Sequence, residues 1–256
     1  FNEFWFWIFN HTKDLIVNRP LDPSTGGTRI QTNVGEIQGQ GLEIDLGLNI
    51  LRSDDSSGID WSINTNFNTN KSEVTDLGQD TDIIVYSGFS NLGNAAIVGQ
   101  QLGTIVGSRV ARTANGELRV DAAGNYIEEE VDENGLLPVI GNANPDFTLN
   151  VNNNFRYKNF NLSFLLNYVA GGDFYSNTIS ALIGRGVVAG EFDRDATFIL
   201  PGVNPAGEIN TKQINNSDYY FNNVAFGASE LQIYDATTIR LQEISLGYSI
   251  PKNILE

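Results

Sequence analysis

Residues 147–168 read FTLNVNNNFRYKNFNLSFLLNY and alternate apolar with polar side chains on both sides of an interruption at 157–159. Successive side chains of a β-strand point to opposite faces, so the stretch predicts a hairpin with one apolar and one polar face. Each arm has about the ten residues that a tilted strand needs to cross a bilayer. The polar face is mostly Asn, Ser and Thr, which suits a membrane barrel with a watery lumen. A soluble β-sandwich alternates in the same way, so this hairpin alone leaves both folds open.

The same alternation recurs along the chain at Leu42–Ile50, Ile59–Phe67 and Ile239–Ile250, and we expect a sixth strand within residues 3–18. The apolar phase of the last segment slips by one residue at Gln242-Glu243, which predicts a β-bulge. In these three segments and the two hairpin arms, the charged residues all occupy alternate positions that share the polar face, here called the polar parity. They are Glu43, Asp45, Asp60, Arg156, Arg240 and Glu243. A lipid-facing surface and a soluble core would both exclude charge in this way.

The lengths of the connections separate the two folds. Short polar turns follow Ile50 and Phe155, whereas the stretches at about 71–144 and 171–235 are too long for ordinary loops of a compact domain. Outer-membrane barrels alternate short periplasmic turns with long extracellular loops, and a sandwich gives no reason for that order. Within the long stretches we expect a small hairpin at 115–135, with turns at 123–124 and 134–135, and a short helix at 177–184.

Composition excludes several classes of function. The 256 residues include 15 Lys and Arg against 31 Asp and Glu, a formal net charge of −16. Binding of nucleic acid needs basic patches, so no nucleic acid partner is expected; the acidic excess suits a neutral or cationic ligand, or the solvation of loops. The chain has no Cys and therefore no disulfide or thiolate metal site. No apolar run predicts a transmembrane helix. Without an initial Met or a signal peptide, the chain is expected to be a piece of a longer polypeptide.

Five segments, in the same order and spacing, resemble the carboxy-terminal barrel region of the SusC/RagA family of TonB-dependent outer-membrane transporters of Bacteroidota. They read TKDLIVNRPLDPSTGG at 12–27, NVGEIQGQGLEIDL at 33–46, VGQQLGTIVG at 98–107, GNANPDFTLNVNNNFRYKNFNLSFLLNYVAGGDFYS at 141–176 and TTIRLQEISLGYSIPKNIL at 237–255. The start of the chain departs from the family, because FNEFWFWIF contains more Trp than that strand is expected to have.

The resemblance implies an all-β fold, an antiparallel transmembrane β-barrel segment with two long extracellular loops. Residues 1–256 would form part of a barrel of about 22 strands in the outer membrane, occluded by a plug, with the plug, the TonB box and the final strands outside this chain. The implied function is TonB-dependent import of oligosaccharides or peptides. The implied partners are outer-membrane lipid, TonB, a SusD-like surface lipoprotein and, in one arrangement, a dimer of transporter–lipoprotein pairs.

The aromatic residues of the long loops are the candidate ligand contacts, because rings stack on sugars and offer polar tips. They are Tyr86, Phe89, Phe174, Tyr175, Phe192, Tyr219, Tyr220 and Phe221. Loops of this length also need small cores of their own, and aromatic residues supply them, so a structural role is the competing interpretation for each. The consecutive residues 219–221 are the preferred contact cluster.

No catalytic site, metal site or cofactor is expected, and the chain is not expected to be an enzyme. Its only histidine, His11, argues against a catalytic triad or a His-based metal site and is interpreted as a rim residue. The acidic stretch 121–132 lacks the calcium-loop pattern, so a solvated loop is preferred there and at Asp80 and Asp82. Two alternatives remain, a passive porin or structural barrel and a soluble β-sandwich adhesin or carbohydrate-binding module.

Overall fold

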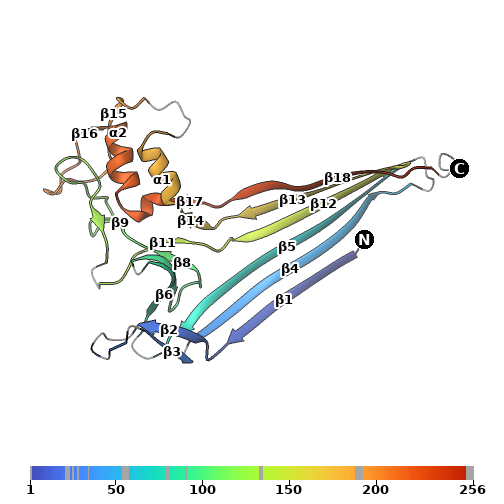
Figure 1. The fold of residues 1–256 in the computed structure, drawn as a ribbon, viewed down its shortest axis with the longest axis horizontal. Coiled ribbons are helices and arrows are strands. Elements are labelled where there is room, and N and C mark those ends of the chain that lie inside the picture. Colours follow the sequence, from blue (N-terminus) through green and yellow to red (C-terminus); the bar gives the residue numbers. More distant parts are fainter. Residues whose placement is uncertain are drawn as a thin grey trace.

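The computed structural model describes residues 2–20, 24, 26–27, 29–33, 35–53, 58–78, 81–89, 91–132, 135–187 and 193–251. Its largest element is an antiparallel sheet of six long strands in the order β1-β4-β5-β12-β13-β18 (Figure 1). These strands are β1 (Asn2–Thr12), β4 (Glu36–Leu51), β5 (Ile59–Asp76), β12 (Phe147–Tyr157), β13 (Phe160–Ala170) and β18 (Thr238–Tyr248). The predicted strand content and antiparallel pairing are confirmed.

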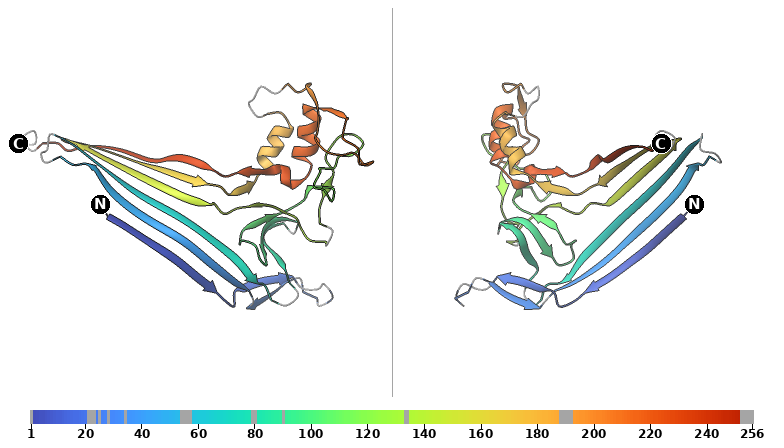
Figure 2. Two further views of the ribbon diagram at one scale, coloured as in Figure 1. Left: turned by 180° about the vertical axis from the view of Figure 1, so that it is seen from behind. Right: turned by 45° about the vertical axis from the view of Figure 1, so that its right-hand side comes forward.

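The connections divide between the two ends of this sheet, as both views of Figure 2 show. The β4–β5 and β12–β13 connections are short and lie at one end, with the amino- and carboxy-terminal ends of the chain nearby. The long connections gather at the opposite end, where the stretch between β1 and β4 adds a third connection that the sequence analysis did not count as a loop.

Small elements fold the long connections. The strands are β2 (Ile16–Pro20), β3 (Arg29–Asn33), β6 (Ile83–Phe89), β7 (Leu92–Ile97), β8 (Thr104–Val106), β9 (Arg109–Val110), β10 (Glu128–Glu129), β11 (Val139–Asn142), β14 (Asp173–Tyr175), β15 (Thr197–Ile199), β16 (Gln213–Asn215) and β17 (Ile233–Asp235). The helices are α1 (Asn177–Gly184), α2 (Asn216–Asp218), the π-helix η2 (Tyr219–Ala225) and the 3-10 helix η3 (Ser229–Gln232). None of the helices that the structure describes is long and apolar enough to cross a membrane.

Local features follow the sequence closely. The β12–β13 hairpin closes with Tyr157 opposite Phe160, and Lys158 takes a left-handed φ of 52° in the turn. Leu165 and Leu166 of β13 pair with Glu243 and Leu241 of β18, which leaves Gln242 without an opposite residue. The bulge predicted at Gln242-Glu243 is therefore confirmed. Helix α1 has the predicted bounds and is capped by Ser176, whose hydroxyl accepts a hydrogen bond from the backbone N–H of Ile179.

The apolar parity forms one face of the sheet and is open to its surroundings. Ile239 is 77 % exposed and Leu246 is 74 % exposed, which a soluble sheet would not tolerate over so large an area. Aromatic rings collect on this face near both ends of the strands, as in the girdles of membrane barrels. One group contains Phe67, Phe147 and Tyr168, and the other contains Trp61, Phe155, Phe160 and Tyr248.

The apolar face also carries polar residues, among them Thr65, Asn153 and Glu3, which the sequence analysis did not single out. Asn153 faces the same side as its partners Ile63 and Phe164, is only 7 % exposed, and accepts a hydrogen bond from the indole N–H of Trp61 at 3.3 Å. That bond satisfies a buried amide oxygen that would otherwise have no partner on the apolar face. Glu3 stands opposite Leu46 on β1, so the charge-free face does not extend over that strand.

The strands β4 and β5 are longer than the alternation predicts. Strand β4 begins at Glu36, six positions before Leu42, and the added part contains glycines on the polar parity. A Cβ atom at Gly39 would overlap the side-chain amide of Asn10, and one at Gly41 would lie 2.9 Å from the carbonyl oxygen of Thr69. Glycine therefore permits the close pairing of these strands. Because glycine has no side chain, residues 36–41 show no alternation of apolar and polar side chains, and the sequence did not predict this part of the strand.

Arginine substitutions should distinguish the two faces of the sheet. Phe164→Arg places a cation on the apolar face and should destabilise the full-length protein in lipid by about 2–4 kcal/mol if the position is near the midplane. Asn152→Arg changes the polar face of the neighbouring strand and should cost less than about 1 kcal/mol. Urea unfolding in lipid vesicles measures both, and equal losses at the two positions would contradict the assignment of the faces.

Candidate functional site

The polar face of the sheet is a hydrogen-bonded wall. One transverse row crosses five strands, and its members are Asp45, Asn66, Asn150, Asn167 and Arg240. Asn66 donates to Asp45 at 2.7 Å and Asn167 donates to Asn150 at 2.8 Å. Amides that bond one another across strands hold their remaining donors and acceptors in place, so the wall presents amide groups in fixed orientations.

A shallow hollow of about 430 Å³ lies on this wall. Phe4 of β1, Asp45 of β4, Asn64 of β5 and Asn152 of β12 all contribute to its lining. The hollow therefore combines one aromatic ring with amides and a carboxylate. Toward the short turns, Arg156 forms an ion pair with Asp60, which fixes a positive and a negative charge on neighbouring strands.

The two longest connections fold together into a single body, here called the mouth assembly, comprising the described residues of 82–146 and 171–237. Glu230 accepts hydrogen bonds from the backbone N–H of Val110 at 2.9 Å and from the guanidinium of Arg112 at 2.6 Å. Asn223 accepts from the backbone N–H of Tyr126 at 2.7 Å and donates to Asn125 at 3.0 Å. These bonds join segments about a hundred positions apart, which sequence patterns do not indicate.

Apolar packing reinforces this union. Val120 of the first connection is fully buried against Leu200 and Ile214 of the second, and Tyr219 packs against the same cluster. Within the first connection, Glu129 accepts a hydrogen bond from Arg109 at 2.9 Å and raises the pKa of that guanidinium. A second apolar cluster, with Val74 at its centre, anchors β6 and β7 to the end of β5. The mouth assembly is therefore a packed structure with its own cores.

Tyr86 lines a cavity of about 370 Å³ beside that second cluster. Leu15, Ile16, Leu77 and Ile84 also line the cavity, which makes it mainly apolar. The Tyr86 ring is half exposed, and burial of its phenol raises its pKa, so the hydroxyl stays protonated at neutral pH. Tyr86 therefore presents a neutral hydroxyl at an apolar cavity.

The other predicted contacts separate into structural and exposed residues. Phe174 and Tyr175 lie on β14, where the Phe174 ring packs 5.8 Å from Tyr234 and the Tyr175 hydroxyl donates to Gln232 at 2.9 Å. Phe89 is 74 % exposed at the tip of the β6–β7 hairpin. Phe192 lies outside the described residues.

The preferred cluster 219–221 does not present its three rings together. Tyr219 turns inward, with its ring 5.4 Å from Phe198 and 5.1 Å from Tyr220, and burial raises the pKa of its phenol. Phe221 is half exposed and its ring lies 4.9 Å from that of Phe226. Phe221 lies in η2 and Phe226 directly follows its last residue, so the end of this π-helix brings the two rings together.

Phe226 is the residue that the sequence analysis missed. It is 64 % exposed and forms with Phe221 an apolar pair on the surface of the mouth assembly. Phe226 lies just beyond the end of η2, and an α-helix would place residues five apart on different faces. Nothing in the sequence marks η2 as a π-helix, so this spacing did not point to the pair.

The acidic and histidine candidates have structural partners. Asp121 accepts hydrogen bonds from the backbone N–H groups of Ala123 and Asn125, so its carboxylate forms the turn predicted at 123–124. His11 lies at the loop end of β1, 3.1 Å from the Glu36 carboxylate. Asp82 is exposed, whereas Asp80 lies outside the described residues. Asn134, part of the second predicted turn, also lies outside them. In the part of the chain that the structure describes, no cluster of acidic and histidine side chains could hold a metal ion.

The chain is similar to curated TonB-dependent receptors. It is 25 % identical over 268 residues to TonB-dependent receptor P3 of Formosa agariphila, with 95 % of this chain and 25 % of the relative covered. It is also 25 % identical over 296 residues to TonB-dependent receptor P39 of the same organism, with 95 % and 27 % covered. The chain spans about a quarter of the length of these relatives. No family model matches it.

Solved structures of the RagAB peptide transporter share the fold. One matches with a TM-score of 0.65 at 18 % identity and covers 96 % of this chain and 26 % of that chain. The RagAB peptide importer in its closed-closed state also matches at 0.65, with 16 % identity and coverage of 99 % and 27 %. The resemblance drawn from the sequence is thereby confirmed, with the transporter-barrel fold and the outer-membrane location.

The inward and outward rings of η2 should respond differently to truncation. Tyr219→Ala removes a ring from a packed cluster and should destabilise the mouth assembly by about 2–4 kcal/mol. Phe221→Ala removes an exposed ring and should change stability by less than about 0.5 kcal/mol. Limited proteolysis of the full-length protein would measure both, and faster cleavage of the Phe221 variant would contradict the assigned orientations.

Proposed function

We propose that this chain forms part of the barrel wall and the extracellular mouth of a TonB-dependent importer. The observation that carries the proposal is one sheet with an open apolar face, a hydrogen-bonded polar face, short turns at one end and a packed mouth assembly at the other. The apolar face would contact lipid, and the polar face would line the lumen. Energy for import would come from TonB acting on a plug.

The proposed ligand is an oligosaccharide or a peptide. Neutral amides on the wall, the Phe4 hollow and the exposed Phe221–Phe226 pair suit a ligand that combines hydrogen-bonding groups with apolar surface. The apolar cavity at Tyr86 would accept an aliphatic or aromatic side chain, which gives some support to the peptide. The likeness to a peptide transporter points the same way.

The proposed partner is a SusD-like surface lipoprotein seated on the mouth assembly. The exposed Phe89, Phe221 and Phe226 give that surface apolar anchors, the kind of residue that concentrates binding energy at protein interfaces. Affinity purification of tagged full-length protein from outer membranes should recover this lipoprotein. Truncating the three rings to Ala should reduce its recovery at least fivefold.

The two alternatives, a soluble β-sandwich and a passive porin, differ from this proposal in structure and in their need for TonB, respectively. A β-sandwich needs a second sheet packed on the apolar face, whereas over the described residues that face remains exposed. A passive porin would transport without TonB. Accumulation of fluorescein-labelled casein peptides and of fluorescein-labelled maltoheptaose should therefore be compared in cells with and without TonB.

Loss of TonB should reduce accumulation of one of these two probes at least tenfold in cells that express the full-length protein. The control is a strain that lacks the transporter, in which TonB should make no difference to that probe. TonB-independent uptake would support the porin, and absence of uptake for both probes would reject the two proposed ligand classes.

Cysteine labelling should place the mouth assembly outside the cell. Glu130→Cys and Ala206→Cys lie at exposed positions of the two longest connections, and Arg52→Cys lies in the short β4–β5 turn. A membrane-impermeant maleimide on intact cells should label the first two and leave the third unlabelled until the cells are lysed. Labelling of Arg52→Cys in intact cells would invert the topology.

A further inference from the structure

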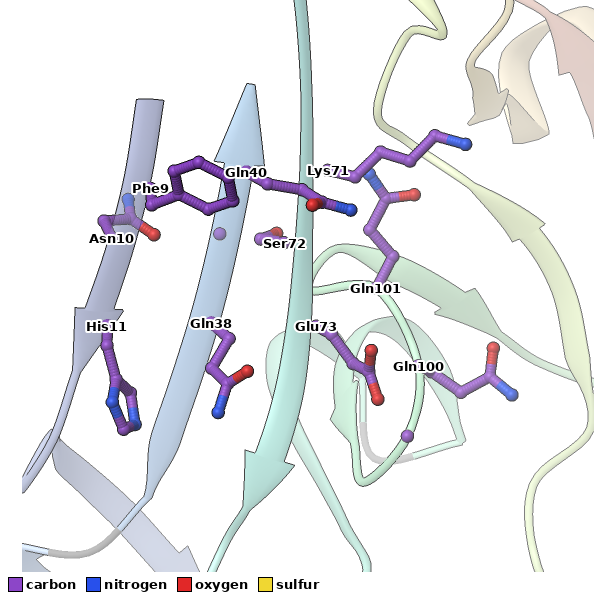
Figure 3. Close-up of a pocket in the computed structure, with 12 residues that line it drawn as sticks. Phe9, Asn10, His11, Gln38, Gln40, Lys71, Ser72, Glu73, Gln100 and Gln101 are labelled. Atoms are coloured by element: carbon purple, nitrogen blue, oxygen red, sulfur yellow. The ribbon is translucent and has the colours of Figure 1, made fainter. Parts of the chain in front are cut away.

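A polar cleft of about 600 Å³ lies at the loop end of β1, β4 and β5, on the face opposite the cluster that anchors the mouth assembly (Figure 3). The register arranges its side chains in two transverse rows. Phe9, Gln40 and Lys71 form the first row, and His11, Gln38 and Glu73 form the second. The segment with Gln100 and Gln101 closes the side next to β5.

The cleft begins where the apolar band of the sheet ends. The next row along the same face is Trp7, Leu42 and Thr69, and the one beyond it is Trp5, Ile44 and Phe67. On the opposite face at the height of the cleft, Ile37 and Val74 pack into the buried cluster beneath β6 and β7. The cleft therefore looks outward, away from the lumen, and lies next to the headgroup layer of the outer leaflet.

The groups that line the cleft are mostly uncommitted. Among the described residues, the side chains of Gln38, Gln40 and Lys71 have no hydrogen-bonding partner. Gln101 accepts a hydrogen bond from Asn142 at 2.6 Å, which fixes its amide and leaves its N–H groups available. The backbone of β5 is already paired with this segment, since Val74 N–H donates to the carbonyl oxygen of Gln100 at 2.9 Å.

We propose that this outward-facing cleft binds a saccharide. The amides of Gln38, Gln40 and Gln101 supply donors and acceptors, which is what sugar hydroxyls require, and the Phe9 ring offers a face for the C–H side of a pyranose. The volume suits a ligand of one or two sugar units. The saccharide comes either from a glycolipid headgroup of the outer leaflet or from a free oligosaccharide.

Other ligand classes fit less well. A peptide that adds a strand needs a free backbone edge, and β4 and β5 are paired on both sides along the floor of the cleft. A phosphate needs concentrated positive charge, whereas Glu73 faces the same cleft as Lys71, and the Glu36 carboxylate already contacts His11 and Lys13. The cleft lies outside the proposed import path, so its occupant need not be the transported ligand.

Binding can be tested on the full-length protein in detergent with two probes, purified lipopolysaccharide and maltoheptaose. The test variant is Gln38→Leu/Gln40→Leu, which removes two amides without changing charge. The matched control is Gln31→Leu/Gln213→Leu, at exposed positions on β3 and β16. Calorimetric titration gives the affinities, and thermal unfolding verifies that all proteins are folded.

The test variant should bind at least one probe at least tenfold more weakly than the parent, with the control within twofold. Loss confined to lipopolysaccharide identifies the glycolipid source, and loss that includes maltoheptaose identifies a free sugar. Absence of binding to both probes, or equal binding by parent and test variant, overturns the proposal. If a Lys71→Gln variant abolishes binding while the Gln38→Leu/Gln40→Leu variant does not, the saccharide proposal is overturned in favour of phosphate. Uptake should persist in the test variant, so this result is separate from the proposed import function.

Discussion

Backbone hydrogen bonding in an apolar medium is the constraint on which this sheet depends. Hydrocarbon offers no partner to a free N–H or C=O group, so the strands must pair continuously, and pairing fixes which side chains share a face. The row from Asp45 to Arg240 shows the result, because a slip of one residue in any strand would move its polar side chains to the apolar face. The bulge at Gln242 obeys the same rule, since it keeps both Arg240 and Glu243 on the polar face.

This constraint also explains what could be predicted from the sequence. Alternation is visible at 42–50 and 147–168 because these stretches have one apolar and one polar face. It disappears at 36–41 and 70–76, where β4 and β5 continue beyond the apolar band into the cleft and the mouth assembly. It is also obscured in β1, whose Phe4 and Phe6 share the face of Asp45 and Glu43, so that both parities are aromatic.

The candidate contacts were less predictable, because sequence alone does not separate aromatic residues that stabilise a loop from those that are exposed on it. Tyr219 and Phe221 are two positions apart and have opposite environments, which depends on η2 and on packing against Val120 in a different connection. The union of the two longest connections rests on pairs such as Asn125 with Asn223. No periodicity in the chain encodes such pairs.

The junction between sheet and mouth assembly determines how the two parts can act together. Gly171 and Gly172 carry the chain out of β13 with φ values of 71° and 83°, and the Asp146 carboxylate at the end of the other connection occupies the space that a Cβ at Gly171 would need. Gly171 also donates its N–H to the Thr237 hydroxyl at 3.0 Å, next to the start of β18. The ends of β12, β13 and β18 are thus tied at one point. Because the longest connections are joined to each other and to this point, the register of the sheet fixes the position of the mouth above the wall.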